Sequence, residues 1–297
     1  MAFLKRIFLF LIVNIAVVAV FMTVVSVTGI DTAYLTPNGL NLQALAVVAL
    51  LFGMISSVVS LFISKWMAKW MMKVQIIKDP RANHEVELVH MVKHLADQAN
   101  IGMPEVGIYP SNEINAFATG WNRNNALVAV SEGLLNAMNK DELEGVLAHE
   151  VAHIKNGDMV TMTLIQGVIN AFIIFGARVA AFAVMRAMGR SSDEIGGFAY
   201  WGVSILFEIF FGIIASTIVM AFSRWREFGA DYGGAQLSSK KKMVAALQFL
   251  QKHHRVETQH KSFATMKMNG DSAFMKLFSS HPPLEKRIMA LQAAPIH

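Results

Sequence analysis

The sequence of 297 residues contains no cysteine and is poor in charge, since only 16% of its residues are aspartate, glutamate, lysine or arginine. Without thiols the chain cannot form disulfide bonds, and metal sites built on thiolates are excluded as well. Any bound metal ion must therefore have nitrogen and oxygen ligands. The absence of cysteine leaves the redox compartment of the protein undecided.

Long apolar blocks account for the shortage of charge. Hydrophobic residues make up 54% of the chain, and the mean hydropathy of +0.44 is too high for an ordinary soluble protein. Four blocks have the length and composition of membrane-spanning helices, namely 7–27, 42–63, 159–177 and 198–222. We therefore predict a mostly helical, multi-pass membrane protein with about four hydrophobic helices. A cleaved signal peptide is the alternative for the first block, although this block is longer than the apolar core of such a peptide.

Basic residues flank the first two blocks on one side. Lys5 and Arg6 precede the first block, and Lys65, Lys69 and Lys73 follow the second, among two tryptophans. The loop between the blocks has no lysine or arginine, so the positive-inside rule places both ends of this hairpin in the cytoplasm. The formal net charge of +5 is modest and lies beside apolar blocks. This favours a lipid bilayer as a partner and argues against nucleic acid.

The rest of the chain has the composition of a soluble domain in two parts. We predict four segments in order, which are a transmembrane hairpin over 1–73, the first part of the soluble domain over 74–158, a second hairpin over 159–222 and the second part of the domain over 223–297. Whether the second hairpin crosses the membrane completely is left open by the sequence.

The first part of the soluble domain begins with an amphipathic helix over 83–100. Strand candidates follow at 106–109, 114–118 and 126–130. We therefore expect an α+β domain with a small sheet. The helix carries His90 and His94 four residues apart, but Met91 stands where a catalytic carboxylate would be needed, so we interpret this pair as solvated surface.

The strongest chemical signal is a segment that contains His149, Glu150 and His153. Residues four apart lie on one face of an α-helix, so the two imidazoles can bind one ion while Glu150 flanks a water molecule. Zinc hydrolases use this set, together with a third ligand from elsewhere in the chain and an open fourth position.

The surrounding residues predict a helix around this motif. Asn139 followed by Glu142 has the spacing of a capping box, and Gly157 is a C-terminal stop. Between them apolar residues recur at helical spacing, at Leu143, Val146, Leu147 and Ile154. Because Val146 shares a stripe with both histidines, we expect the imidazoles to point inward.

The residues after His153 exclude one way of completing the site. A third histidine in the extended motif would require glycine at 156 and histidine at 159, but Asn156 and Met159 are found there. The downstream carboxylates that remain are Glu194, Glu208, Glu227, Glu257 and Glu285. The predicted topology removes Glu194, which falls on the far side of the membrane, and Glu208, which falls within the bilayer.

Glu227 is the strongest remaining candidate because it lies five residues past the fourth block, on what should be the same helix. Asp231 shares its face and would accept a hydrogen bond from the free nitrogen of a metal-bound histidine, which fixes the tautomer. The stretch Asn115, Ala116, Phe117 and Ala118 is the candidate edge strand that holds a peptide substrate by β-pairing. An ordinary core strand is the alternative for that stretch.

Four motifs in this order resemble the HtpX family of bacterial membrane zinc metalloproteases, to which eukaryotic prenyl-protein endopeptidases are related. They lie at 115–118, 149–153, 223–231 and 280–283, the last containing His281 before two prolines. The resemblance covers essentially the whole chain. It implies a gluzincin-type cytoplasmic domain that binds one Zn²⁺ per chain through His149, His153 and Glu227, with Glu150 as the general base.

The resemblance further implies endoproteolysis of misfolded or damaged membrane proteins and unfolded polypeptides in membrane quality control and the stress response. It also implies a location in the bacterial inner membrane, with the active site facing the cytoplasm. His281 is a candidate for stabilising the developing oxyanion, and Arg224 is the weaker candidate. Oligomeric state and cleavage preference do not follow from the sequence.

Two other functions stay open at this stage. One is a transporter or channel in which Arg178 and Glu208 line a path. Their predicted depths differ by about five residues, roughly 7 Å at the helical rise, and we expect them to pair, the alternative being that Glu208 faces a water-filled cavity. The other is the processing of prenylated proteins by the same zinc chemistry.

Overall fold

The computed structural model describes residues 34–36, 39–190, 197–264 and 281–295, and the predicted first apolar block lies outside them. The chain divides into two compact units. Unit 1 consists of Met1–Val58 and Leu164–Ala215, and unit 2 consists of Val59–Thr163 and Ser216–His297.

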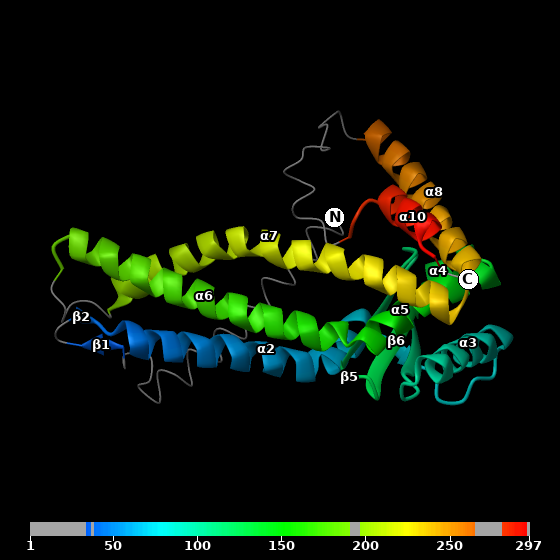
Figure 1. Ribbon diagram of the computed structural model, residues 1–297, viewed down its shortest axis with the longest axis horizontal. Coiled ribbons are helices and arrows are strands. Elements are labelled where there is room, and N and C mark those ends of the chain that lie inside the picture. Colours follow the sequence, from blue (N-terminus) through cyan, green and yellow to red (C-terminus); the bar gives the residue numbers. More distant parts are fainter. Residues whose placement is uncertain (1–33, 37–38, 191–196, 265–280, 296–297) are drawn as a thin grey trace. The chain divides into compact units, whose positions relative to one another are not determined.

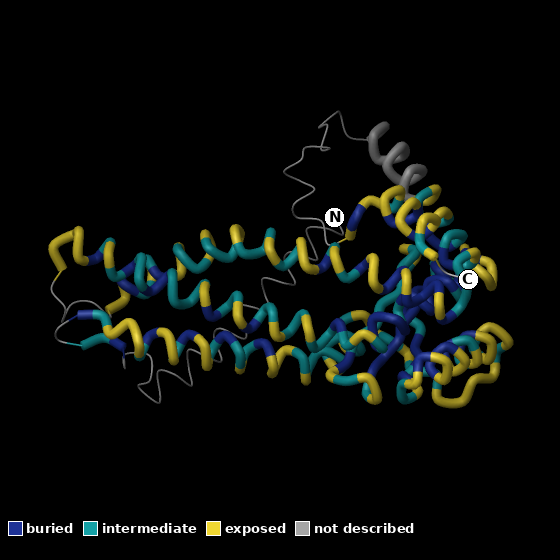
Figure 2. Tube along the Cα trace, viewed as in Figure 1, coloured by how far each residue is buried: buried dark blue, intermediate teal, exposed yellow. Residues whose placement is uncertain are grey.

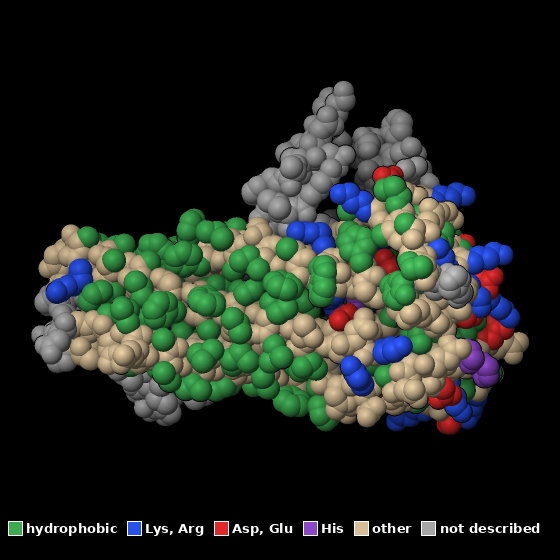
Figure 3. Space-filling view, viewed as in Figure 1, with side chains coloured by type: hydrophobic (Ala, Val, Ile, Leu, Met, Phe, Trp, Pro, Cys, Tyr) green, Lys and Arg blue, Asp and Glu red, His purple; other side chains and the backbone are tan. Residues whose placement is uncertain are grey.

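Three long helices, α2 (Leu42–Met72), α6 (Asp158–Ala187) and α7 (Phe198–Leu237), contribute residues to both units. In the described part of the chain these are the three helices long and apolar enough to cross a membrane. Figure 3 shows hydrophobic side chains covering much of their visible surface, and Figure 2 shows that much of this surface is only partly buried. The second, third and fourth apolar blocks are therefore helical, as predicted.

Each of these helices is longer than the apolar block that predicted it. The third block continues in helical form to Ala187. The fourth continues through Glu227 and Asp231 to Leu237, so Glu227 lies on the same helix as the fourth block, as expected. No proline or helix-ending glycine conformation interrupts α7, which explains why the helix does not stop where its apolar composition ends.

Unit 1 contains a short antiparallel pair of strands, β1 (Leu35–Thr36) and β2 (Gly39–Leu40). It also contains Arg178 of α6 and Glu208 of α7. Nη1 of Arg178 donates to Oε1 of Glu208 at 2.7 Å, which confirms the predicted pairing. The guanidinium also lies over the ring of Trp201, 4.4 Å from its centroid, a cation–π contact that further compensates the buried charge.

The sheet of unit 2 has the order β3-β4-β6-β5. It is formed by β3 (Gln75–Ile76), β4 (Glu105–Tyr109), β5 (Ala116–Asn122) and β6 (Asn125–Ser131). Strands β4 and β6 are parallel, and the other neighbours are antiparallel. Strands β4 and β6 coincide with predicted strands to within one residue, whereas β5 begins two residues later and ends four residues later than the predicted 114–118. Strand β3 has too few residues to show an alternating pattern. Strand β5 lies at an edge of the described sheet.

The described part of unit 2 also contains the helices that Figure 1 labels around the sheet. They are α3 (Asn83–Ala99), α4 (Glu132–Ala137), α5 (Lys140–Asn156), α8 (Lys240–Ala264) and α10 (Leu284–Ala293). Helix α3 presents the predicted polar face, on which His90 and His94 are both exposed. The interpretation of this histidine pair as solvated surface is confirmed.

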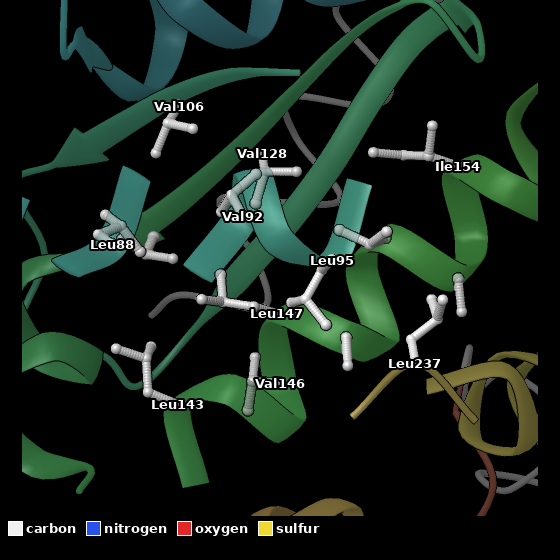
Figure 4. Close-up of a cluster of buried hydrophobic side chains, with 14 of the residues drawn as sticks. Leu88, Val92, Leu95, Val106, Val128, Leu143, Val146, Leu147, Ile154 and Leu237 are labelled. Carbon is white, nitrogen blue, oxygen red and sulfur yellow. The ribbon is translucent and has the colours of Figure 1, made fainter. Parts of the chain in front are cut away.

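The core of unit 2 surrounds α5. Leu147 and Ile154 of this helix are fully buried, and they belong to one cluster with residues of α3, β4, β6 and α7. Figure 4 shows Leu88, Val92 and Leu95 of α3 and Val128 of β6 in the same cluster. Burial of a large aliphatic side chain contributes about 1.5–3 kcal/mol, so this packing fixes the position of the helix that carries the histidine motif.

Candidate metal centre

The ends of α5 are defined by the residues that predicted them. Oδ1 of Asn139 accepts a hydrogen bond from the backbone N–H of Glu142 at 3.0 Å, and Oε2 of Glu142 accepts one from the N–H of Asn139 at 3.0 Å. Gly157 ends the helix in the left-handed conformation with φ 72°. The helix is thereby set in a register that turns His149 and His153 inward, and both are buried.

Helix α7 brings Glu227 to the two histidines. Nε2 of His149 lies 3.1 Å from Nε2 of His153. The carboxylate of Glu227 lies 3.5 Å from the first nitrogen through Oε2 and 3.3 Å from the second through Oε1. All three side chains are buried, and together they form a group that could hold a metal ion.

These distances fit a tetrahedral ion. Ligand atoms about 2.0–2.1 Å from a common centre are separated by about 3.3 Å in tetrahedral geometry. The three observed separations of 3.1, 3.3 and 3.5 Å lie around that value, although the last two are measured to different oxygens of the Glu227 carboxylate. One ligand atom from each of the three side chains lies within 4.8 Å of the others, so the group comes close to the spacing of zinc ligands.

The other ring nitrogens each face a carboxylate. Nδ1 of His149 lies 3.0 Å from Oδ1 of Asp231, and Nδ1 of His153 lies 2.5 Å from Oδ2 of Asp158. A carboxylate accepts a hydrogen bond, so in the neutral imidazole the single proton resides on Nδ1. The lone pair on each Nε2 atom then points toward the Nε2 atom of the other histidine and toward Glu227. Oε1 of Glu227 is itself buried and receives no hydrogen bond, as expected of an oxygen that binds a metal ion.

The electrostatics of the site agree with this conclusion. Burial alone would lower the pKa of His149, but its contacts with Asp231 and Glu227 outweigh burial and raise the pKa to about 9. Likewise, burial is outweighed at His153 by the contacts with Asp158 and Glu227, and the pKa of this ring is raised. A metal ion would displace these protons, because ligation requires the deprotonated rings.

Sequence reasoning missed Arg287, a buried residue of α10. Its guanidinium donates to both oxygens of Asp231, at 2.7 and 2.6 Å, and Nη1 lies 3.2 Å from Oε2 of Glu227. These contacts raise the pKa of Arg287 against the opposing effect of burial. No local pattern around Arg287 marks it, because its partners are more than 50 residues away in sequence.

Asp158 was also missed, although a local signal for it exists. It directly follows the helix-ending Gly157 and opens α6, where an acidic residue is favoured by the helix dipole. The turn at Gly157 directs its carboxylate back to His153. A search for an acidic residue just after a metal-binding helix would have identified it.

The other predicted residues lie as follows. Glu150 is half-buried beside His149 on α5, where its charge acts on His153 and Arg287. Nδ1 of His281 lies 2.7 Å from Oε2 of Glu227, and 60% of its side chain is exposed. Arg224 lies on α7 and is partly buried.

The candidate substrate strand is at an edge of the sheet, as expected. Residues Ala116 to Ala118 open β5, and Asn115 precedes it. The backbone carbonyl of Asn115 accepts from the N–H of Ser131 at 3.0 Å. Ala116 and Ala118 pack against the core that contains α5.

The rejected carboxylates have other partners or lie outside the described residues. Glu208 is paired with Arg178, and Oε1 of Glu285 accepts from Nε2 of Gln251 at 3.2 Å. Glu194 and the side chain of Glu257 lie outside the described residues. Among the described carboxylates, Glu227 thus joins the two motif histidines in the cluster.

The fold and this cluster define a class of protein, a membrane-embedded metallopeptidase. Residues 82–294 match the family model described as peptidase family M48. The chain belongs to this family, and it is a membrane metalloendopeptidase that acts on polypeptides. Membership of the family excludes the transporter alternative.

Similar proteins support this assignment. The chain is 50% identical over 292 residues to Protease HtpX of Tolumonas auensis, covering 97% of this chain and 99% of the relative. It is 50% identical over 291 residues to a Protease HtpX homolog of Thiobacillus denitrificans, covering 98% and 99%. The crystal structure of S. mikatae Ste24p has the same fold, with a TM-score of 0.60, 19% identity, and coverage of 94% of this chain and 66% of that chain.

Proposed function

We propose that the protein is a zinc endopeptidase that binds one Zn²⁺ per chain through His149, His153 and Glu227. The observation that carries this proposal is the convergence of three buried side chains whose ligand atoms lie within 4.8 Å of one another, with both Nδ1 atoms facing carboxylates. Asp231 and Asp158 fix the tautomers of the two ligand rings. Sulfur ligands are absent, which leaves nitrogen and oxygen, both accepted by zinc.

When bound, zinc would polarise the peptide carbonyl and lower the pKa of water toward about 7. Glu150 accepts the proton of the attacking water and transfers it to the leaving amine. Its half-buried position next to His149 suits this role, because the carboxylate can reach both the site and solvent. His281, at the exposed side of Glu227, is the candidate that stabilises the oxyanion.

The substrate is proposed to bind as an added strand along β5. An edge strand has unpaired backbone N–H and C=O groups that can pair with an extended peptide. The segment 115–118 leads into this strand and packs beside α5 through its alanines. Such pairing would hold the scissile bond by backbone contacts, which suits an enzyme that accepts many sequences.

Chain connectivity supports membrane proteins as substrates. Only Gly157 separates α5 from α6, and Glu227 lies on α7, five residues past the predicted fourth apolar block. Helix α5 thus leads directly into the apolar helix α6, and Glu227 lies on the apolar helix α7 itself. We therefore propose a site close to the membrane surface. There it would cleave misfolded or damaged membrane proteins at cytoplasmic or juxtamembrane sites.

This proposal includes a location and a domain organisation. We propose a bacterial inner-membrane protein with its site facing the cytoplasm, as the basic residues around the second apolar block indicate. The segments 1–73 and 159–222 would form the membrane hairpins, while 74–158 and 223–297 would form the protease domain. Its role would be membrane quality control during stress.

The chemical part is tested by the Glu150→Gln variant. The protein is purified with a chelator to prevent self-digestion, and zinc is then added to wild type and variant. Both should bind one zinc per chain, while the variant should lose casein hydrolysis by about 10²–10⁴-fold, the usual contribution of a general base. Glu144→Gln is the matched control on α5, because Glu144 is bonded to Lys242 instead. Full activity in Glu150→Gln would contradict the base assignment.

The substrate class is tested separately with wild-type enzyme in nanodiscs. A destabilised membrane protein, soluble unfolded casein and a farnesylated C-terminal peptide are offered at equal concentration. We expect cleavage of the first two and little cleavage of the third. Efficient cleavage of casein without any cleavage of the membrane protein would overturn the membrane-substrate proposal and leave the zinc chemistry intact.

A further inference from the structure

The connection between β5 and β6 contains a bulge centred on Trp121. In the ladder of these strands Gly120 pairs with Ala126 and Asn122 pairs with Asn125, so Trp121 has no partner residue. Gly120 has φ 150°, and a Cβ added there would lie 2.3 Å from the carbonyl oxygen of Asn125. The bulge therefore requires glycine. A bulge of this kind turns a side chain out of the regular alternation of the strand.

The turned side chain meets the last third of α2. The ring centroid of Trp121 lies 5.5 Å from that of Phe62. On either side of it, Oγ1 of Thr119 donates to Oγ of Ser64 at 3.1 Å, and Nζ of Lys65 donates to Oδ1 of Asn125 at 2.6 Å. Both strands of the hairpin are thus fixed to the same stretch of helix. All of these residues belong to unit 2.

That stretch of α2 extends past the hydrocarbon of a bilayer. The helix has 31 residues, which is about 46 Å at the helical rise, whereas the hydrocarbon layer is about 30 Å thick. After Phe62 the exposed side of the helix continues with Trp66 and Trp70, whose rings stack at 6.1 Å and are 63% and 68% exposed. Exposed tryptophans at the end of an apolar helix are typical of the headgroup region.

The lysines of the same stretch form ion pairs with another part of the protein. Lys65 lies 3.0 Å from a carboxylate oxygen of Glu105 at the start of β4, and Lys69 binds the other oxygen of this carboxylate. The basic residues predicted to bind lipid headgroups are therefore partly engaged within the protein. The aromatic residues Phe62, Trp66, Trp70 and Trp121, here called the aromatic strip, are left as the surface that continues the apolar helix.

We propose that the aromatic strip lies in the headgroup region of the bilayer and that Trp121 holds the β5–β6 hairpin against the membrane surface. The occupant of this surface is lipid, because the strip is continuous with a helix that has the length and composition of a membrane span. A consequence that rests on the proposed function is that strand β5 begins its substrate pairing at the membrane surface, where a segment leaving the bilayer becomes available.

The natural absence of cysteine allows a direct test. A nitroxide is attached to the single cysteine of Arg123→Cys, next to Trp121, in metal-free full-length protein held as one copy per nanodisc. Its accessibility to oxygen, which concentrates in lipid, is compared with that to a water-soluble nickel complex. Trp66→Cys is the lipid-facing reference, and Val86→Cys is the solvent reference, since Val86 is exposed among polar residues of α3.

We expect the label at position 123 to resemble that at 66, with several-fold higher oxygen-to-nickel accessibility than at 86. Adding Trp121→Ser to the Arg123→Cys protein should shift the ratio toward that of position 86. A label at 123 as accessible to nickel as the one at 86 would overturn the proposal. Strong spin–spin coupling between labels of two chains would also overturn it, because the strip would then be a subunit contact. The metal-free protein is inactive, so failure of the proposed enzymatic function leaves this measurement unaffected.

Discussion

The two units of the molecule each bury a cluster of charged side chains, and the clusters differ in whether they are complete. In unit 1, Arg178 and Glu208 neutralise each other at 2.7 Å, and Trp201 covers the guanidinium. In unit 2, the carboxylates of Glu227, Asp231 and Asp158 surround two imidazoles and only one guanidinium, that of Arg287. This group has two negative charges in excess when the imidazoles are neutral.

The difference indicates which cluster binds something. A complete ion pair stabilises the structure only if its mutual attraction exceeds the cost of removing both charges from solvent, and it can often be replaced by apolar residues. An incomplete cluster needs a cation, and a divalent ion supplies two positive charges at the point where three lone pairs meet. The same kinds of residue are therefore expected to have a structural role in one unit and a ligand role in the other.

The largest difference is expected between two glutamate variants. Glu227→Gln removes a proposed ligand and its charge, so zinc affinity should fall by more than the 10–100-fold that loss of an outer partner costs. Glu208→Gln should leave zinc binding unchanged. Zinc titration of both purified variants checks this. Equal affinities in the two variants would remove the distinction between the clusters.

Replacing both members of the ion pair in unit 1 should cost little stability, whereas replacing one member alone should destabilise the protein. Glu208→Gln leaves Arg178 buried without its partner and should lower the free energy of unfolding by about 3 kcal/mol, the lower end for buried pairs because Glu208 is partly exposed. The double variant Arg178→Met with Glu208→Met should recover most of the lost free energy of unfolding. Chemical unfolding in detergent measures both effects. A double variant as unstable as the single one would show that the pair has a role beyond mutual neutralisation.

A smaller effect is expected at the carboxylates behind the ligands. Asp158→Asn keeps the shape of the side chain but weakens the acceptor for Nδ1 of His153. Zinc affinity should fall by about 10–100-fold. Competition with a chelator of known affinity provides the measurement, and Asp141→Asn, an exposed residue in the first turn of α5, is the control. An unchanged affinity in Asp158→Asn would mean that this carboxylate does not orient the ring.

The smallest effect, counted per pH unit, is the pH dependence of metal binding. Because the pKa of His149 is raised from 6.5 to about 9 in the metal-free protein, its proton stabilises that protein fully below pH 6.5, and this stabilisation is lost as pH rises through 9. Zinc requires the deprotonated ring, so its affinity should rise by up to about tenfold per pH unit in the same window. Calorimetry in buffers of different ionisation enthalpy should detect the released proton. A pH-independent affinity would contradict the assignment of His149 as a ligand.

Much of the candidate site could be predicted because its signals are local. The spacing of His149 and His153, and the Asn139 and Glu142 cap that sets their helix, are properties of one short segment. Glu227 was selected by its distance from an apolar block, since a long helix without a breaker continues in register. Arg287 could not be found in this way because it comes from a separate helix near the end of the chain. The bulge at Trp121 was also missed, since only the partner strand reveals that one residue is unpaired.

By itself the sequence determined the membrane-protein class, the long apolar helices and the histidine helix, because helical periodicity and hydrophobicity act over neighbouring residues. Only the tertiary structure decided that Asp158 and Arg287 join the proposed ligands and that β5 is joined to α2 through Trp121. Those arrangements depend on packing between segments far apart in sequence. Packing is set by how whole surfaces fit together, and no single segment contains that information.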